Sequence, residues 1–168
     1  MDKTNQETLN ILLDKAKLYP NQNQQRRSDT AINGQHPKAA ILCCSDSRVI
    51  PEEIFDCSIG DLFVIRTAGN TLGPNELASF EYAYHHLGIS LFIVLGHTHC
   101  GAVGSALEGH HGALMDTIRE HIHDEKDPIE ASKKNTLAVA SELVQEFKGQ
   151  TDVVALIYDI HEGMVEPL

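Results

Sequence analysis

The chain has 168 residues, of which 42% are hydrophobic and 22% are charged, a composition typical of one soluble globular domain. A formal net charge of −11 would repel polyanions, and no nucleic-acid-binding motif accompanies it, so we expect no nucleic-acid partner. No apolar run reaches the roughly 20 residues that span a bilayer, and we expect no membrane partner.

The first 35 residues predict a helical arm. Thr4 followed by Glu7 is a capping-box pattern, apolar residues recur at helical spacing over residues 4–18, and Pro20 ends the helix. The polar residues 21–35 leave room for a second short helix. Charges throughout residues 1–17 exclude the apolar segment of a signal peptide, and we therefore expect a cytoplasmic protein.

Beyond residue 38, apolar runs suited to strands alternate with helical patterns. Strands are predicted at residues 39–43, 62–65, 90–95 and 153–158, with a short edge piece at 164–168. Helices are predicted at residues 51–55, 75–87, 103–107, 113–123 and 129–147. This order predicts an α/β fold, in which a mostly parallel central sheet is flanked by helices. We expect one domain, residues 1–168, that includes the arm.

Two clusters of reactive side chains follow predicted strands. The segment Cys44-Ser45-Asp46-Ser47-Arg48 follows the first strand, and His97-Thr98-His99-Cys100-Gly101 follows the third. Ligands of parallel sheets bind beyond the carboxyl ends of the strands. Both clusters are therefore expected at one binding edge.

Cys44, His97 and Cys100 form a candidate metal-binding set. Zinc prefers thiolate and imidazole ligands, and a catalytic zinc site keeps a fourth position open for water. The spacing of His97 and Cys100 would place both on one face of a helical turn. Cys43 and His99 are alternative ligands, although Cys43 suits the core and His99 suits a pocket wall. Buried thiols or a redox pair are the alternatives to a metal site.

One further cysteine, Cys57, is expected to be buried and inert.

Asp46 and Arg48 are the candidate catalytic residues. An arginine can hold a carboxylate through a bidentate pair, so Asp46 could accept a hydrogen bond from zinc-bound water without displacing it. A loop salt bridge without a catalytic role is the alternative. Because both residues lie on the loop that begins with a candidate ligand, we favour the catalytic role.

Several motifs, in their order, resemble those of β-class carbonic anhydrases. They are Cys44-Ser45-Asp46-Ser47-Arg48-Val49, the segment 60–66, Ala68-Gly69-Asn70, Phe80-Glu81-Tyr82-Ala83 and the segment 96–101. The resemblance covers residues 34–107 and is fainter towards residue 168. Two departures stand out, since a Gly-Asn-x-Arg-Phe segment is missing from the arm and Thr67 replaces a more usual asparagine.

The resemblance implies a zinc lyase with one Zn²⁺ per chain, held by Cys44, His97 and Cys100. It implies the reversible hydration of carbon dioxide to bicarbonate and a proton through a zinc-bound hydroxide, with Asp46 and Arg48 orienting that hydroxide. It also implies a homodimer or an assembly of dimers. In some members the equivalent aspartate closes the site by binding zinc, and the sequence leaves open whether Asp46 does so.

Other functions compete with this interpretation. The same scaffold could act on carbonyl sulfide or carbon disulfide, since pocket shape decides between these substrates. A structural zinc protein would need a fourth permanent ligand, for which Asp46 is the candidate. A nucleotide-binding domain is set aside, because the glycine-rich phosphate-binding motifs are absent.

Overall fold

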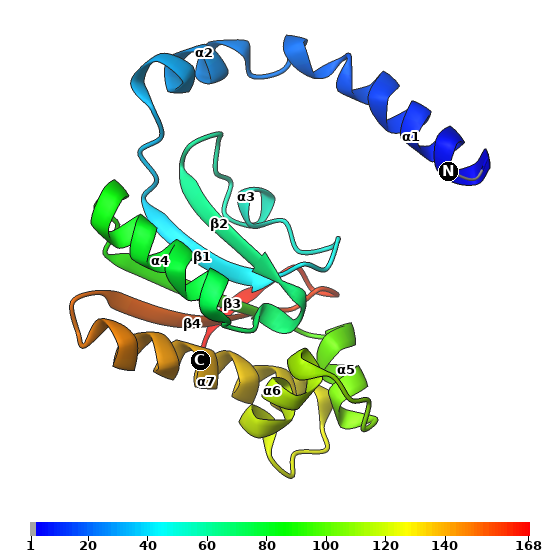
Figure 1. Cartoon of the computed structure of the whole chain (residues 1–168), viewed down its shortest axis with the longest axis vertical. Helices are drawn as coiled ribbons and strands as arrows, with labels where there is room; N and C mark the ends of the chain where they lie inside the picture. The colour runs from blue at the N-terminus through cyan, green and yellow to red at the C-terminus, as the bar shows by residue number, and fades with distance from the viewer. Residues whose placement is uncertain (1–2) are drawn as a thin grey trace. The chain divides into compact units, whose positions relative to one another are not determined.

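The computed structural model describes residues 3–168 and divides into two compact units, Met1–Gln35 and His36–Leu168 (Figure 1). The first unit holds α1 (Lys3–Ala16), the short 3-10 helix η1 (Tyr19–Asn21) and α2 (Gln24–Asn33). The predicted first helix is confirmed, but it begins at Lys3, so Thr4 lies inside the helix. The polar stretch after it does contain a second helix.

Neither helix of the first unit has a buried residue. Arg27 joins α2 to η1, because its guanidinium donates to the carbonyl of Tyr19 at 3.0 Å and lies 5.0 Å from the centre of the Tyr19 ring. Large apolar side chains are nevertheless exposed along the unit. They are Leu9, Ile11, Leu12, Leu13, Leu18, Tyr19 and Ile32. The arm therefore carries apolar surface that it does not bury itself.

The second unit is built on a five-stranded sheet in the order β2-β1-β3-β4-β5. Its strands are β1 (Ala39–Cys44), β2 (Leu62–Thr67), β3 (Leu91–His97), β4 (Asp152–Tyr158) and β5 (Val165–Pro167). The first four strands pair in parallel, and only β5 runs antiparallel to its neighbour. All six residues of β1 are buried, as expected for a strand covered on both faces. The predicted mostly parallel sheet is confirmed.

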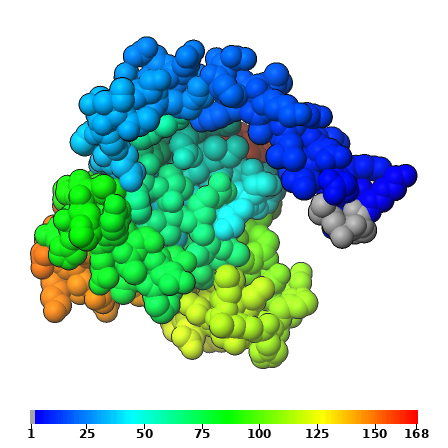
Figure 2. Space-filling model, turned by 45° about the horizontal axis from the view of Figure 1, so that its top comes forward, coloured from blue at the N-terminus to red at the C-terminus, as the bar shows by residue number. Residues whose placement is uncertain are grey.

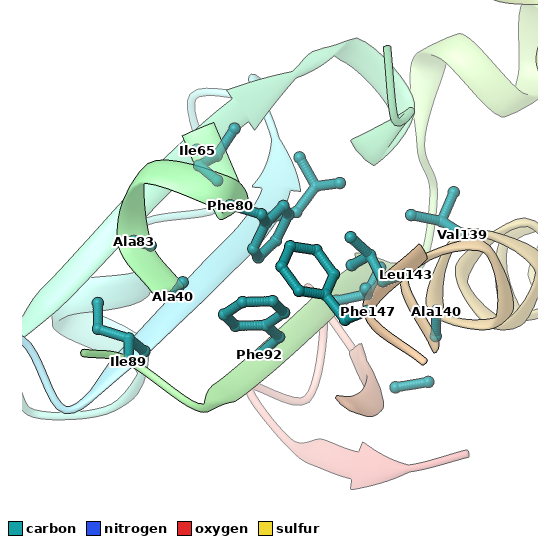
Figure 3. Packing of buried hydrophobic residues seen from close by; sticks show 13 residues of the cluster. Ala40, Ile65, Phe80, Ala83, Ile89, Phe92, Val139, Ala140, Leu143 and Phe147 are labelled. Carbon is teal, nitrogen blue, oxygen red and sulfur yellow. The ribbon is translucent and has the colours of Figure 1, made fainter. Parts of the chain in front are cut away.

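One face of the sheet is covered by two long helices, α4 (Pro74–Leu87) and α7 (Pro128–Phe147). Three aromatic rings join these helices to the central strand (Figure 3). The ring centres of Phe80 and Phe92 are 4.7 Å apart, and those of Phe92 and Phe147 are 4.8 Å apart. Aromatic pairs at such spacings add to the stabilisation from burial alone.

The other face carries far less helix. Ile41, Cys43 and Leu95 pack there against Val49 and against partly buried residues of α3 (Pro51–Ile54) and of the C-terminal segment. Helices therefore flank both faces, as predicted, but within the described part of this unit the second face has only a single-turn helix.

Beyond the carboxyl ends of β1 and β3 lie η2 (Ala68–Asn70), α5 (Gly101–Leu107) and α6 (Ala113–Ile122). α5 and α6 pack together and form the lower lobe of the space-filling view (Figure 2). No helix within residues 3–168 is both long and apolar enough to cross a membrane.

Candidate metal centre

Cys44, His97 and Cys100 converge at the carboxyl edge of the sheet. β1 ends at Cys44 and β3 ends at His97, and these two strands are parallel neighbours. Cys100 is the N-cap residue of α5. One ligand atom from each side chain lies within 4.8 Å of the other two, and all three residues are buried. The predicted metal-binding set is thus brought together from two strand ends and one helix start.

The spacing of His97 and Cys100 has a different physical reason from the one predicted. His97 belongs to a strand and Cys100 precedes a helix, so the two do not share a helical turn. Between them, His99 adopts a left-handed backbone with φ of 54°. This tight reversal, rather than helical periodicity, brings the imidazole and the thiol to the same place.

The hydrogen bonding of His97 leaves one ring nitrogen available. Its Nδ1 lies 2.9 Å from the carbonyl oxygen of Thr98, and a carbonyl can only accept, so Nδ1 carries the proton. Nε2 is buried and has no hydrogen-bond partner among the described residues. An unpartnered polar atom in the interior is costly, and a metal ion beside the two thiols would give Nε2 a partner.

The two thiols are strongly coupled. Their sulfur atoms lie 4.0 Å apart. A hydrogen bond from Cys100, with further bonds from the amides of Asp46 and Gly69, lowers the pKa of Cys44. The same bond to Cys44, together with burial, raises the pKa of Cys100. Without a cation only one of the two thiols ionises readily.

A divalent cation between the sulfurs would favour ionisation of both, and thiolate with imidazole is the donor set that suits zinc. The residues present therefore fit a zinc ion.

Asp46 and Arg48 form the bidentate pair predicted from the sequence. Arg48 donates from Nε to Oδ1 of Asp46 at 2.9 Å and from Nη2 to Oδ2 at 2.7 Å. Nη2 also donates to the carbonyl of His99 at 3.2 Å, which ties the first cluster to the second. The hydrogen bond from Arg48 holds the pKa of Asp46 well below its usual range. Asp46 is therefore a carboxylate at any physiological pH, able to accept a hydrogen bond but not to donate one.

The alternative ligands lie elsewhere. Cys43 points into the core on the opposite face of the sheet, and burial raises the pKa of its thiol to about 12. His99 is exposed and contributes its carbonyl oxygen to Arg48. Cys57 is only half-buried, and its thiol donates to the carbonyl of Phe55. The prediction that Cys57 is buried was therefore wrong, because it lies in the loop after α3.

Two supports of the site were not identified from the sequence. Arg66, on β2, donates to the carbonyls of Cys44, Asp46 and Val49 and so holds the loop that follows β1. The sequence feature that could have identified Arg66 is a charged residue within an otherwise apolar strand. Asn135, on α7, donates to the carbonyl of Gly69 at 2.8 Å, and no local pattern connects residues so far apart in the chain.

Comparison with known proteins identifies a single family. Residues 39–146 match a family model described as carbonic anhydrase. The chain is 48% identical to carbonic anhydrase 2 of Mycobacterium tuberculosis over 89 residues, 53% of this chain and 42% of that protein. It is 33% identical to a carbonic anhydrase of Pseudomonas aeruginosa over 182 residues, 89% of this chain and 80% of that protein.

Solved structures agree with the sequence matches. The β-carbonic anhydrase CcaA superimposes with a TM-score of 0.82 at 29% identity, covering 95% of this chain and 94% of that one. A tetrameric β-carbonic anhydrase of Sordaria macrospora has a TM-score of 0.77 at 27% identity, with 99% and 98% covered. The chain spans about half the length of several curated relatives, for example 54% of a carbonic anhydrase from Synechocystis.

Proposed function

Because the chain belongs to the β-class carbonic anhydrase family, we propose that it catalyses the reversible hydration of carbon dioxide to bicarbonate and a proton. The observation that carries this proposal is the convergence of Cys44, His97 and Cys100 beside a carboxylate that Arg48 holds by two hydrogen bonds. A metal-assisted hydration needs three protein ligands with an open fourth position, and a carboxylate held in place can orient the water there.

The proposed cofactor is one Zn²⁺ per chain. His97 would bind it through Nε2, because Nδ1 is committed to Thr98, and Cys44 and Cys100 would bind it as thiolates. When bound, zinc supplies hydroxide near neutral pH, because coordination lowers the pKa of water. Two anionic ligands neutralise the charge of the ion, so we expect activity to rise on the alkaline side of neutrality.

Asp46 would orient the attacking water. Its carboxylate is ionised and can accept a hydrogen bond from that water. Arg48 engages both oxygens of Asp46, which supports a carboxylate that stays beside the metal instead of occupying its fourth position. The same contact argues against a closed structural site with Asp46 as a permanent ligand.

The proposed assembly is a homodimer or a set of dimers in which residues 1–168 act as one domain. Its support is the arm of residues 1–35, whose α1 and α2 bury none of their residues and expose a row of apolar side chains. A solved relative is tetrameric. Analytical ultracentrifugation tests this proposal, and a strictly monomeric protein at micromolar concentration would contradict it.

We also propose a cytoplasmic location. The four cysteines are free thiols, and two of them have sulfur atoms 4.0 Å apart. A reducing compartment keeps such thiols available to bind a metal. Fractionation of cells with a compartment marker tests this point, and recovery with the secreted fraction would contradict it.

Stopped-flow hydration of carbon dioxide between about pH 6.5 and 9 tests the proposed reaction. Carbonyl sulfide and carbon disulfide should be assayed with the same preparation, because both are linear molecules open to the same attack. We expect carbon dioxide to turn over fastest, at rates that rise with pH. Faster turnover of a sulfur substrate would reject the proposed substrate but not the metal site.

A further inference from the structure

The amide of Gly69 donates to Sγ of Cys44 at 3.2 Å, a shorter distance than the 3.4 Å from the amide of Asp46 to the same sulfur. Gly69 lies in the middle of η2 with φ of 67°, a conformation that side chains disfavour. A Cβ at this position would lie 2.7 Å from Cδ1 of Ile118 and 3.2 Å from Cβ of Ala102. The turn is therefore packed tightly against α5 and α6, in the one conformation that aims its amide at the sulfur.

The carbonyl of the same residue is held by a side chain of α7. Nδ2 of Asn135 donates to it at 2.8 Å, and Asn135 is completely buried. Because a carbonyl only accepts, the amide of Asn135 must present Nδ2 to Gly69 and Oδ1 to its other neighbour. That neighbour is His121 of α6, whose Nδ1 lies 2.9 Å from Oδ1.

The orientation of Asn135 determines the protonation of His121. Nδ1 of His121 faces Oδ1 of Asn135, which accepts, so Nδ1 must carry a proton. Nε2 lies 3.0 Å from Oε1 of Glu142, a carboxylate two helical turns beyond Asn135 on the same face of α7. Glu142 accordingly raises the pKa of His121. Both the imidazolium and the neutral Nδ1-protonated form keep the bond to Asn135, so the carbonyl of Gly69 stays held in either state.

We propose that Asn135, oriented by His121, is a positioning residue for the metal ligand Cys44, which it controls through the Gly69 turn. The proposal rests on the proposed zinc site. Asn135 fixes the carbonyl of Gly69, the fixed turn aims the amide of Gly69 at Sγ of Cys44, and that hydrogen bond orients the sulfur. Hydrogen-bonded partners of metal ligands set ligand orientation and metal affinity.

Loss of the donor at position 135 has a defined consequence. An unheld turn lengthens the bond from Gly69 to the sulfur of Cys44, so the orientation of that ligand is less well fixed. Mutation of residues that support a metal ligand by hydrogen bonding lowers metal affinity about 10- to 100-fold. We expect the low end of this range here, seen as metal release about tenfold faster than from the wild type. The sulfur becomes more electron-rich, so its charge-transfer band to bound Co²⁺ moves to lower energy.

The test uses Asn135→Asp, which keeps the shape of the side chain but cannot donate as a carboxylate, and Asn135→Leu, which introduces no charge. Ser132→Ala is the matched control, because Ser132 is buried on the same helix and its hydroxyl donates to the carbonyl of Pro128. Three measurements are made: zinc release to a chelator, the spectrum of the Co²⁺-loaded protein, and the proton shift of the Gly69 amide in metal-free protein.

The proposal predicts that both Asn135 variants change all three measurements while Ser132→Ala changes none. Wild-type values in a folded Asn135 variant, or equal changes in Ser132→Ala, overturn it. If neither Asn135 variant folds, His121→Leu takes their place, and wild-type values there also overturn it. A wild-type protein that binds no zinc rejects the proposed function, whereas the Gly69 amide shift still decides the role of Asn135.

Discussion

Gly96 precedes the candidate ligand His97, and its α-carbon has no room for a side chain. A Cβ there would lie 1.9 Å from Oγ1 of Thr136 and 3.1 Å from its Cβ. Since ordinary contacts begin near 3.5 Å, the overlap with Oγ1 is roughly 1.5 Å. Thr136 is completely buried and its hydroxyl donates to the carbonyl of Ser132 at 2.8 Å. β3 and α7 therefore cannot move apart to make room without a loss of stability.

We therefore expect Gly96→Ala to lower the free energy of unfolding by about 1–3 kcal/mol, the range for overpacked cores. Thr136→Ala removes the atom that clashes, so the double variant should recover at least about 1 kcal/mol of that loss as coupling between contacting residues. Urea unfolding at one protein concentration and one zinc concentration measures both effects, since binding and assembly also change stability.

Two results would refute this reasoning. One is a Gly96→Ala protein within about 0.5 kcal/mol of the wild type, the range of harmless surface changes. The other is a double variant in which the two losses simply add, because that would mean the residues do not touch. Zinc content of the same samples shows whether the displaced strand carries His97 with it.

Three further predictions follow from the contacts of the site and of α6 and α7. Cys44→Ala should abolish zinc binding measured by atomic emission. Cys43→Ala should retain one zinc per chain, because the thiol of Cys43 faces the other side of the sheet, and equal loss of zinc in both variants would contradict the assignment of Cys44 as the ligand. Arg48→Ala should retain zinc and lower kcat for hydration by about 10- to 100-fold. The control Arg119→Ala removes an arginine paired with Asp116 on α6 and should leave kcat unchanged. An unchanged kcat in Arg48→Ala would show that the pair of Asp46 and Arg48 is a loop salt bridge. Because Glu142 raises the pKa of His121 in the folded protein, their pair should stabilise the fold fully below the unfolded pKa of about 6.5 and lose this effect as pH rises through the folded value. The unfolding free-energy difference between wild type and Glu142→Gln should then shrink from about pH 5.5 to 9, and a difference that grows would refute the pairing.

The strands and their mostly parallel pairing were predictable because parallel strands are buried on both faces. Ala39 to Cys44 reads as a continuous apolar run, and such runs predict a covered strand. Because ligands bind beyond the carboxyl ends of such strands, the sequence also predicted both reactive clusters at one edge of the sheet. The convergence of Cys44, His97 and Cys100 follows from this topology, and their binding of zinc stays a prediction.

Other features depend on tertiary contacts that local patterns do not carry. The reversal at His99 needs a left-handed backbone at a non-glycine residue, which the sequence does not announce. Asn135 and His121 act on a turn more than fifty residues away, and their residue types are ordinary for helix interiors. The half-buried state of Cys57 depends on how the loop after α3 lies, since cysteine alone predicts burial.

The central claim is that Cys44, His97 and Cys100 hold a zinc ion. Crystals of protein purified without chelator, with diffraction recorded on both sides of the zinc absorption edge, test it most directly. We expect one anomalous peak per chain, about 2.0–2.1 Å from Nε2 of His97 and about 2.3 Å from each sulfur. A peak elsewhere, a different metal, or no peak beside three ordered and reduced side chains would contradict it.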